Sequence, residues 1–216
     1  MQATGIIAEY NPFHNGHLYH IQETKRLTQQ PLIVVMSGSF MQRGEPAVLS
    51  KWKRASCAVQ GGADLVLELP CVFTLRSAEF FAKGAVQLLA ATGCVNTLAC
   101  GTEHPQSDFV AAARLACSAE AQAMLRELLQ SGLSYAQAWE KILGANTAFR
   151  TPNDILALEY TKALLQTAAD IQPLYLQRTD EGYNSTAIGN SIASASAIRR
   201  AMADGNESWQ QAVPDY

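Results

Sequence analysis

The alternation of short apolar runs with longer helical segments constrains the fold of this chain more than any other feature. Such alternation is typical of βαβ units around a parallel sheet. Strands are expected at residues 3–8, 31–37, 64–69, 95–101 and 171–178. Helices are expected at 17–28, 50–60 and 77–93, across 106–170, and in 194–202 from a serine cap. The sequence therefore predicts an α/β fold with a Rossmann-like parallel sheet.

The length of 216 residues suits one main domain, because a chain of this size can bury one generous core. We expect that core to comprise residues 1–105 and 171–216, with a helical insertion at 106–170 before the last strand. In open sheets of this kind, ligands bind at the carboxyl ends of the strands, where the strand order reverses. The polar segments 11–17, 37–46, 101–103 and 179–185 all fall at that edge.

Composition and charge exclude several classes of protein. Hydrophobic residues make up 48% of the chain and charged residues 16%, which is typical of soluble globular proteins. The formal net charge of −3 gives no electrostatic argument for nucleic acid. The most apolar stretch, 63–75, is too short and too polar to span a bilayer, and the N-terminal segment lacks the basic start of a secretory signal. We therefore expect a cytoplasmic protein with no membrane partner.

Three of the four histidines lie within seven residues, directly after the first expected strand. If the next helix begins near Asn15, His14 and His17 can both face a ligand held over its first turn. The unpaired N–H groups and positive end of a helix favour phosphate there. Gly16 lets the backbone approach closely, and Pro12 fixes the entry into the turn. Two imidazoles beside a phosphorus centre can stabilise the charge that develops in the transition state.

A metal site is the main alternative for these histidines. The five cysteines, at positions 57, 71, 94, 100 and 117, form no C-x-x-C pair and suit reduced, mostly buried thiols. No further His is suitably spaced, so we predict no metal site. His20 lies one turn beyond His17. It can contact the ligand, or alternatively it can pack against the helix or cap it.

The motif HNGH at residues 14–17 matches the H-x-G-H signature of the nucleotidyltransferase superfamily. Longer stretches at 8–21, 37–55, 100–103, 152–160 and 192–202 match a narrower group. With these segments the chain resembles the bacterial tRNA(Met) cytidine acetate ligase family along essentially its whole length.

The resemblance implies an ATP-dependent ligase that works in two steps. Acetate and ATP would give acetyl-adenylate and pyrophosphate, and the acetyl group would then pass to N4 of the wobble cytidine of elongator tRNA(Met), forming N4-acetylcytidine. ATP would be a substrate accompanied by Mg²⁺, with no tightly bound cofactor. The family's C-terminal region, which helps to bind tRNA, has no counterpart here, so we expect tRNA binding and acetylation to be weakened.

The site implied by the resemblance is centred on the histidine motif, with His14 and His17 as the catalytic residues. The ATP-binding set would be Ile7, Ala8, Glu9, Tyr10, Asn11, Pro12, Phe13, His14, Asn15, Gly16, His17, Leu18, Tyr19, His20, Gly101, Asn153 and Arg178.

Further residues are candidates for contact with phosphate. Ser194, Ser196 and Arg199 resemble the superfamily's second phosphate-binding signature, although a surface helix with a basic end is the alternative. Lys51, followed by Lys53 and Arg54 and preceded by Arg43, is a candidate for pyrophosphate or the tRNA backbone, with a solvated helix face as the alternative. Asn184 and Ser185 depart from the His and Asp of the family pattern, which leaves the acceptor side less defined.

Two other functions share parts of this pattern. An adenylyltransferase of coenzyme biosynthesis also carries H-x-G-H and a serine-capped phosphate segment, but acts on a phosphorylated acceptor. A nucleotide- or RNA-binding module without turnover is the other possibility. The identity of the acceptor thus distinguishes the acetate ligase from the adenylyltransferase. Turnover distinguishes both enzymes from the binding module.

Overall fold

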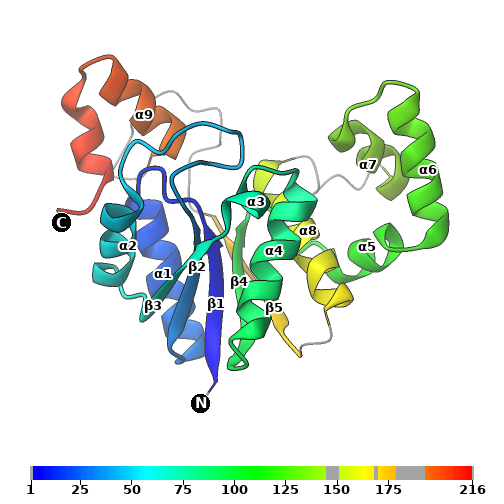
Figure 1. Cartoon of the computed structure of the whole chain (residues 1–216), viewed down its shortest axis with the longest axis horizontal. Helices are drawn as coiled ribbons and strands as arrows, with labels where there is room; N and C mark the ends of the chain where they lie inside the picture. Colours follow the sequence, from blue (N-terminus) through cyan, green and yellow to red (C-terminus); the bar gives the residue numbers. More distant parts are fainter. Residues whose placement is uncertain (1, 145–150, 168–169, 179–192, 216) are drawn as a thin grey trace.

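The computed structural model describes residues 2–144, 151–167, 170–178 and 193–215, and the statements below concern these residues. At its centre lies a five-stranded sheet in the order β3-β2-β1-β4-β5, with every neighbouring pair parallel (Figure 1). The strands are β1 (Ala3–Ala8), β2 (Leu32–Ser37), β3 (Leu65–Leu69), β4 (Val95–Thr102) and β5 (Gln172–Gln177). The expected Rossmann-like parallel sheet is confirmed, and each strand end lies within one residue of its expected position.

The helices fall between and after these strands, as expected. They are α1 (Asn15–Thr28), α2 (Lys51–Gln60), α3 (Cys71–Thr74), α4 (Ala78–Ala91), α5 (Phe109–Ala116), α6 (Ala119–Gln130), α7 (Tyr135–Leu143), α8 (Pro152–Gln166) and α9 (Ala195–Ala203), followed by the 3-10 helix η2 (Glu207–Ala212). The sequence did not predict the short elements α3 and η2. None of the described helices is long and apolar enough to cross a membrane.

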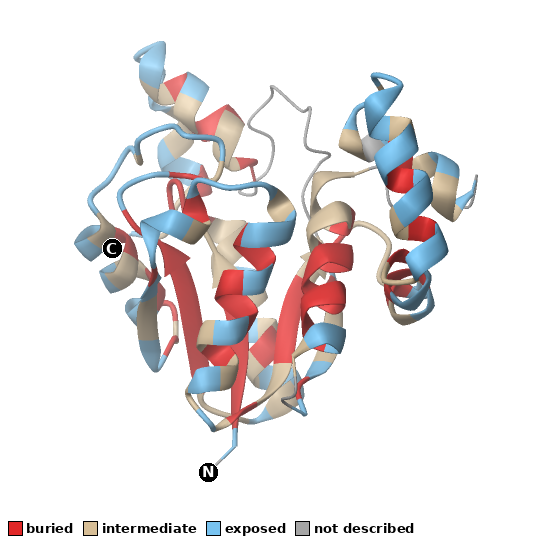
Figure 2. Ribbon diagram, turned by 45° about the vertical axis from the view of Figure 1, so that its right-hand side comes forward, coloured by how far each residue is buried: buried red, intermediate tan, exposed pale blue. Residues whose placement is uncertain are grey.

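Strand β2 shows how both faces of the sheet are covered. Ile33 and Val35 belong to the core that α4 and α8 cover, whereas Leu32, Val34 and Met36 belong to the core that α1 and α2 cover. Successive side chains of a strand point to opposite faces, so a strand between two helical layers is apolar throughout. Figure 2 shows the result, with buried residues along the strands and on the inner sides of the helices.

The described helices between β4 and β5 form two groups. Helix α8 packs against α4 and contacts β4 and β5, so it covers the sheet. Helices α6 and α7 pack against each other around a small core that includes Leu125 and Trp139, away from the sheet (Figure 1). Buried Lys162 on α8 links the two groups, because its Nζ donates to Glu159 Oε2 at 2.8 Å and to the hydroxyl of Tyr135 on α7 at 3.3 Å. The limits of the insertion, 106 and 170, stay a prediction.

Buried Arg54, on α2, holds together the carboxyl ends of β1 and β2. Its Nη1 donates to the carbonyl oxygens of Glu9 at 2.5 Å and Ser37 at 3.1 Å. Its Nη2 donates to the carbonyl of Gly38, and its Nε donates to that of Leu49 at 3.2 Å. Because the side chain is fully buried, we assign Arg54 to the fold and not to contact with phosphate.

Replacing Arg54 with lysine should lower the free energy of unfolding by about 2–4 kcal/mol, because a single ammonium cannot reach all of these carbonyls and leaves some of them unpaired. Urea denaturation measures the difference. The neighbouring variant Lys53→Ala is the control, since Lys53 is exposed, and it should change stability by no more than about 0.5 kcal/mol. Equal stability of Arg54→Lys and the unmodified chain would contradict the assignment.

Candidate functional site

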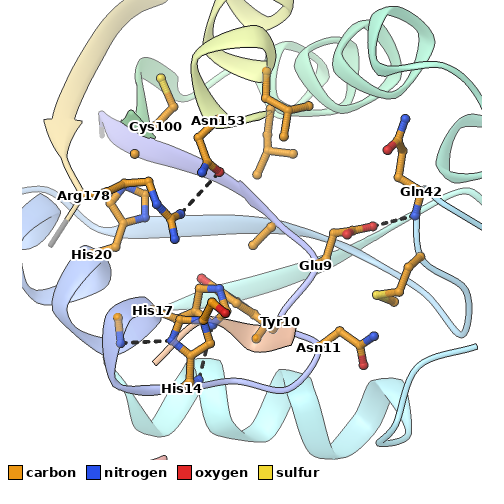
Figure 3. A pocket seen from close by; sticks show the side chains of 18 of the residues that line it. Glu9, Tyr10, Asn11, His14, His17, His20, Gln42, Cys100, Asn153 and Arg178 are labelled. Carbon is orange, nitrogen blue, oxygen red and sulfur yellow. Dashed lines mark hydrogen bonds between the residues drawn. The ribbon is translucent and has the colours of Figure 1, made fainter. Parts of the chain in front are cut away.

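A cavity of about 260 Å³ opens at the carboxyl ends of β1 and β4 (Figure 3). These strands are neighbours in the sheet, and the strand order reverses between them, because β2 and β3 follow on one side and β5 on the other. The wall comes from the β1–α1 turn, the loop between β2 and α2, and the starts of α8 and α9, among other segments. Ligands of open α/β sheets bind at such a position.

Most of the predicted ATP set lines this cavity. The lining members are Ile7, Ala8, Glu9, Tyr10, Asn11, His14, Gly16, His17, Tyr19, His20, Gly101, Asn153 and Arg178. The predicted phosphate residues Ser194, Ser196 and Arg199 line it as well, so segments far apart in the sequence meet in one site.

Pro12, Phe13, Asn15 and Leu18 belong to the predicted set but not to the lining. Phe13 is buried and packs its ring edge-on against Tyr10, with the ring centroids 4.9 Å apart. The amide of Asn15 donates to the carbonyl of Gln211 at 3.0 Å. These two side chains thus stabilise the β1–α1 turn without lining the cavity.

Helix α1 begins with a cap made by the two histidines of the motif. His14 is the N-cap residue, and its Nδ1 accepts a hydrogen bond from the backbone N–H of Gly16 at 3.1 Å. Nδ1 of His17, three residues later, accepts from the backbone N–H of His14 at 3.3 Å. This reciprocal pairing is a capping box built from imidazoles. It explains why the helix starts at Asn15, two residues before the expected start.

The cap also fixes the tautomer of both rings. Each Nδ1 accepts a hydrogen bond, so each neutral imidazole carries its proton on Nε2. The two rings are stacked, with their centroids 3.6 Å apart and their planes 29° from parallel. Tyr10 packs edge-on against His17 at a centroid distance of 4.8 Å. The stacked rings therefore keep two Nε2–H donors for a ligand in the cavity.

Burial keeps the three clustered histidines neutral. Burial, reinforced by the charge of Arg178, lowers the pKa of His14 to about 3 and the pKa of His20 to about 4. Burial also lowers the pKa of His17 well below its ordinary value, with His14 and Arg178 adding to the effect. At neutral pH the site therefore presents uncharged imidazoles beside a guanidinium.

The stability of the protein should fall as the pH is lowered from about 6.5 toward 4. In that window the unfolded chain protonates its histidines, whereas the folded chain holds His14, His17 and His20 neutral, so the unfolded state binds more protons. The free energy of unfolding should drop by up to about 1.4 kcal/mol per pH unit for each histidine. Urea denaturation between about pH 7.5 and about pH 5 measures this slope.

The variant His20→Gln tests the origin of that slope, because it removes one titrating group and leaves the cap of α1 intact. The pH dependence should become shallower by about one third, since one of three such groups is lost. An unchanged slope would show that the clustered histidines do not cause it.

Arg178 brings together the ends of β4 and β5 and the start of α8. Its side chain packs over Gly101, where an added Cβ would lie only 3.2 Å from Arg178 Cγ. Its Nη1 donates to Asn153 Oδ1 at 3.4 Å (Figure 3). The predicted residues Gly101, Asn153 and Arg178 therefore form one wall of the cavity, in which the glycine leaves room for the arginine.

The start of α9 docks against the β1–α1 turn. Ser194 caps α9 by accepting from the backbone N–H of Ala197 at 3.2 Å, and its hydroxyl lies 3.0 Å from that of Ser196. Arg199 Nη1 donates to the carbonyl of Asn11 at 2.8 Å. The first turns of α1 and α9 thus border the same cavity, and both favour anions.

Lys51 is not among the residues that line the cavity. Its ammonium lies 2.6 Å from Glu68 Oε2 on the edge strand β3. Arg43, from the preceding loop, does line the cavity. Asn184 and Ser185, which bear on the acceptor side, lie outside the described residues, as does the whole polar segment 179–185.

The sequence reasoning missed several residues of the cavity wall. They are Met41, Gln42, Glu45, Phe81, Cys100, Leu156, Tyr160, Gln177 and Ala195. The backbone N–H of Gln42 donates to Glu9 Oε1 at 2.6 Å, which attaches the loop after β2 to the end of β1. Burial raises the pKa of Glu9, although this hydrogen bond and Arg43 oppose the rise. The sequence analysis placed the polar run 37–46 at this edge of the sheet, but it did not name Met41, Gln42 or Glu45 as site residues.

The chain is similar to known nucleotidyl transferases and tRNA(Met) cytidine acetate ligases along nearly its whole length. A family model described as HIGH Nucleotidyl Transferase matches residues 1–216. The tRNA(Met) cytidine acetate ligase of Leuconostoc mesenteroides is 46% identical over 222 residues, covering 100% of this chain and 56% of that protein. The ligase of the same name from Acetivibrio thermocellus is 42% identical over 218 residues, covering 95% of this chain and 52% of that protein.

Solved structures are similar as well. The apo crystal structure of Thermotoga maritima TmcAL matches with a TM-score of 0.91 and 36% identity, covering 100% of this chain and 55% of that one. The structure of that protein bound with alpha-thio ATP matches with a TM-score of 0.86 and covers 100% of this chain and 54% of that one. The chain spans about half the length of the curated relatives it matches.

Proposed function

Because the chain belongs to the HIGH nucleotidyl transferase family, we propose that it activates acetate with ATP and passes the acetyl group to the wobble cytidine of elongator tRNA(Met). The observation that carries the proposal is the meeting of His14, His17, Arg178 and two helix N-termini at one cavity. Relatives named tRNA(Met) cytidine acetate ligase, which match the chain over nearly its whole length, support the choice of acceptor.

In the first step, a carboxylate oxygen of acetate attacks the α-phosphorus of ATP. The bond between the α-phosphorus and the bridging oxygen breaks, and pyrophosphate leaves with that electron pair, so that acetyl-adenylate remains. Negative charge builds up on the phosphoryl oxygens during this displacement. The Nε2–H groups of His14 and His17 would donate to those oxygens, and rings that the cap already holds need little reorganisation.

The other lining residues divide between the two ends of ATP in this proposal. The wall of Gly101, Asn153 and Arg178 would hold the adenosine, and the rest of the segment from Ile7 to His20 would enclose the α-phosphate. The start of α9, with Ser194, Ser196 and Arg199, would receive the β- and γ-phosphates. Contact of Lys51 with pyrophosphate or the tRNA backbone stays a prediction, because Lys51 does not line the cavity.

Mg²⁺ would enter with the phosphates of ATP as part of the substrate, since that ion is commonly held by phosphate oxygens and water. Among the described residues, no three His, Cys, Asp or Glu side chains gather where they could hold a metal ion. The proposal needs no tightly bound cofactor. It places the protein in the cytoplasm, where ATP and tRNA are available together.

In the second step, the N4 amine of the cytidine attacks the acetyl carbonyl carbon. The bond from that carbon to the AMP phosphate oxygen breaks, AMP leaves, and the amine loses a proton to solvent. The tRNA would approach the open side of the cavity.

Trapping with hydroxylamine tests the first step. Hydroxylamine converts acetyl-adenylate into acetyl-hydroxamate, which should accumulate only when the protein, ATP, Mg²⁺ and acetate are all present. A product that forms equally well with larger carboxylic acids would contradict the choice of acetate. Adenylylation of phosphate esters supplied in place of acetate would indicate the coenzyme-type adenylyltransferase, and binding of ATP without turnover would indicate the binding module.

A further inference from the structure

We propose that Glu103 is a positioning residue of the nucleotide site, an inference that rests on the function proposed above. Glu103 lies just beyond β4, and its side chain does not line the cavity. Its Oε1 accepts from Asn153 Nδ2 at 2.6 Å, and its Oε2 accepts from the hydroxyl of Thr151 at 2.7 Å. Arg178 Nε lies 3.9 Å from Oε1. One carboxylate thus contacts the residues that precede and begin α8 and the residue that follows β5.

Buried Asp154 holds the backbone of Glu103 in place. Oδ1 of Asp154 accepts from the Glu103 backbone N–H at 3.0 Å and from the Thr102 hydroxyl at 2.6 Å. Its Oδ2 lies 2.7 Å from His104 Nδ1. These donors satisfy Asp154 without the hydroxyl hydrogen of Thr151, although that hydroxyl also lies 2.6 Å from Oδ2. The single hydrogen of Thr151 is therefore available to Glu103.

The bond from Asn153 to Glu103 determines what Asn153 offers to a ligand. Because Nδ2 donates to the carboxylate, the amide is held with Oδ1 toward Arg178 (Figure 3). An amide oxygen has two lone pairs, and Arg178 Nη1 approaches only one of them, at 3.4 Å. Asn153 therefore presents an acceptor to the cavity, which suits a donor of the nucleoside, either a ribose hydroxyl or the exocyclic amine of adenine. Without Glu103 the amide could rotate and offer a donor instead.

An exchange of the two side chains tests this role. Glu103→Ala should weaken ATP binding about tenfold, the loss of one hydrogen bond to a charged group. Asn153→Asp should weaken it at least as much, since it sets two carboxylates against each other. In the double variant Glu103→Gln/Asn153→Asp, the new amide can donate to the new carboxylate, and the net charge is unchanged. ATP binding should then return to within about threefold of the unmodified chain.

Isothermal titration calorimetry gives the ATP affinity of the unmodified chain and of the three variants. The control is Glu127→Gln, at an exposed position on α6, and its ATP affinity should match that of the unmodified chain. Titrations with 2′-deoxy-ATP and GTP distinguish the hydroxyl from the amine as the donor. A double variant that binds ATP no better than Asn153→Asp would overturn the inference about Glu103 but not the proposed function. This comparison holds even if Glu103→Ala fails to fold. An unmodified chain that does not bind ATP would overturn both the inference and the proposed function.

Discussion

Replacing His17 with glutamine should slow acetate-dependent adenylation by about 10²–10³-fold, the usual effect of removing a donor that stabilises charge in the transition state. Glutamine is a common third residue in a capping box, and its side-chain oxygen can still accept the backbone N–H of residue 14. The substitution thus keeps the cap and removes the imidazole donor, because the amide hydrogens of glutamine lie on a flexible chain and not on a ring stacked against His14. A single-turnover measurement of acetyl-adenylate, with ATP and acetate saturating, isolates the chemical step.

His14→Asn is the matched variant for the other half of the pair. Asparagine is among the best N-cap residues, so α1 should keep its start while the imidazole is lost. Both variants should melt within a few degrees of the unmodified protein, which circular dichroism checks. Since the two rings act on one phosphoryl group, the double variant should be slowed by less than the product of the single effects. Normal turnover in either single variant would refute the role of that histidine.

Replacing Arg178 with methionine should weaken ATP binding by about 10- to 100-fold, because its half-buried guanidinium carries a charge that acts on His14, His17 and His20, and hydrogen bonds from a charged donor are strong. Methionine keeps an unbranched stem over Gly101, so the packing between β4 and β5 is disturbed little. Calorimetry with ATP at constant ionic strength gives the affinity of each variant.

Arg200→Met is the control for that experiment. Arg200 is exposed on α9, next to Arg199, and does not line the cavity. Its removal should change ATP affinity by less than about twofold, as expected for an exposed charge. If Arg178→Met and Arg200→Met bound ATP equally well, the assignment of Arg178 to the nucleotide site would be wrong.

The sheet could be predicted from the sequence because each strand carries its own local signal. The apolar runs around Ile33 and Leu98 are short, lie between helical segments and end at polar residues, which fixes both their type and their limits. The start of α1 was harder to predict. A start near Asn15 was considered only as the condition for His14 and His17 to face a ligand, because a histidine is not a usual N-cap and the pattern did not identify His14 as the cap.

Part of the site could likewise be predicted from a local pattern, and part could not. His14, Gly16 and His17 form a compact motif, and their position after a strand predicted their surroundings. The cavity wall formed by Phe81, Leu156 and Tyr160 depends on how α4 and α8 pack against the sheet, which no local pattern reveals. Arg54 shows the same limit, since its sequence neighbours suggest a basic surface while its guanidinium is buried among carbonyls.

Exchange of labelled pyrophosphate into ATP tests the central claim most directly. The exchange runs the first step forward and backward, so it requires the acid that is activated but no tRNA. With the unmodified chain, ATP and Mg²⁺, we expect label to enter ATP when acetate is added and not when acetate is omitted. Exchange that proceeds equally well without acetate, or that never occurs, would contradict the account.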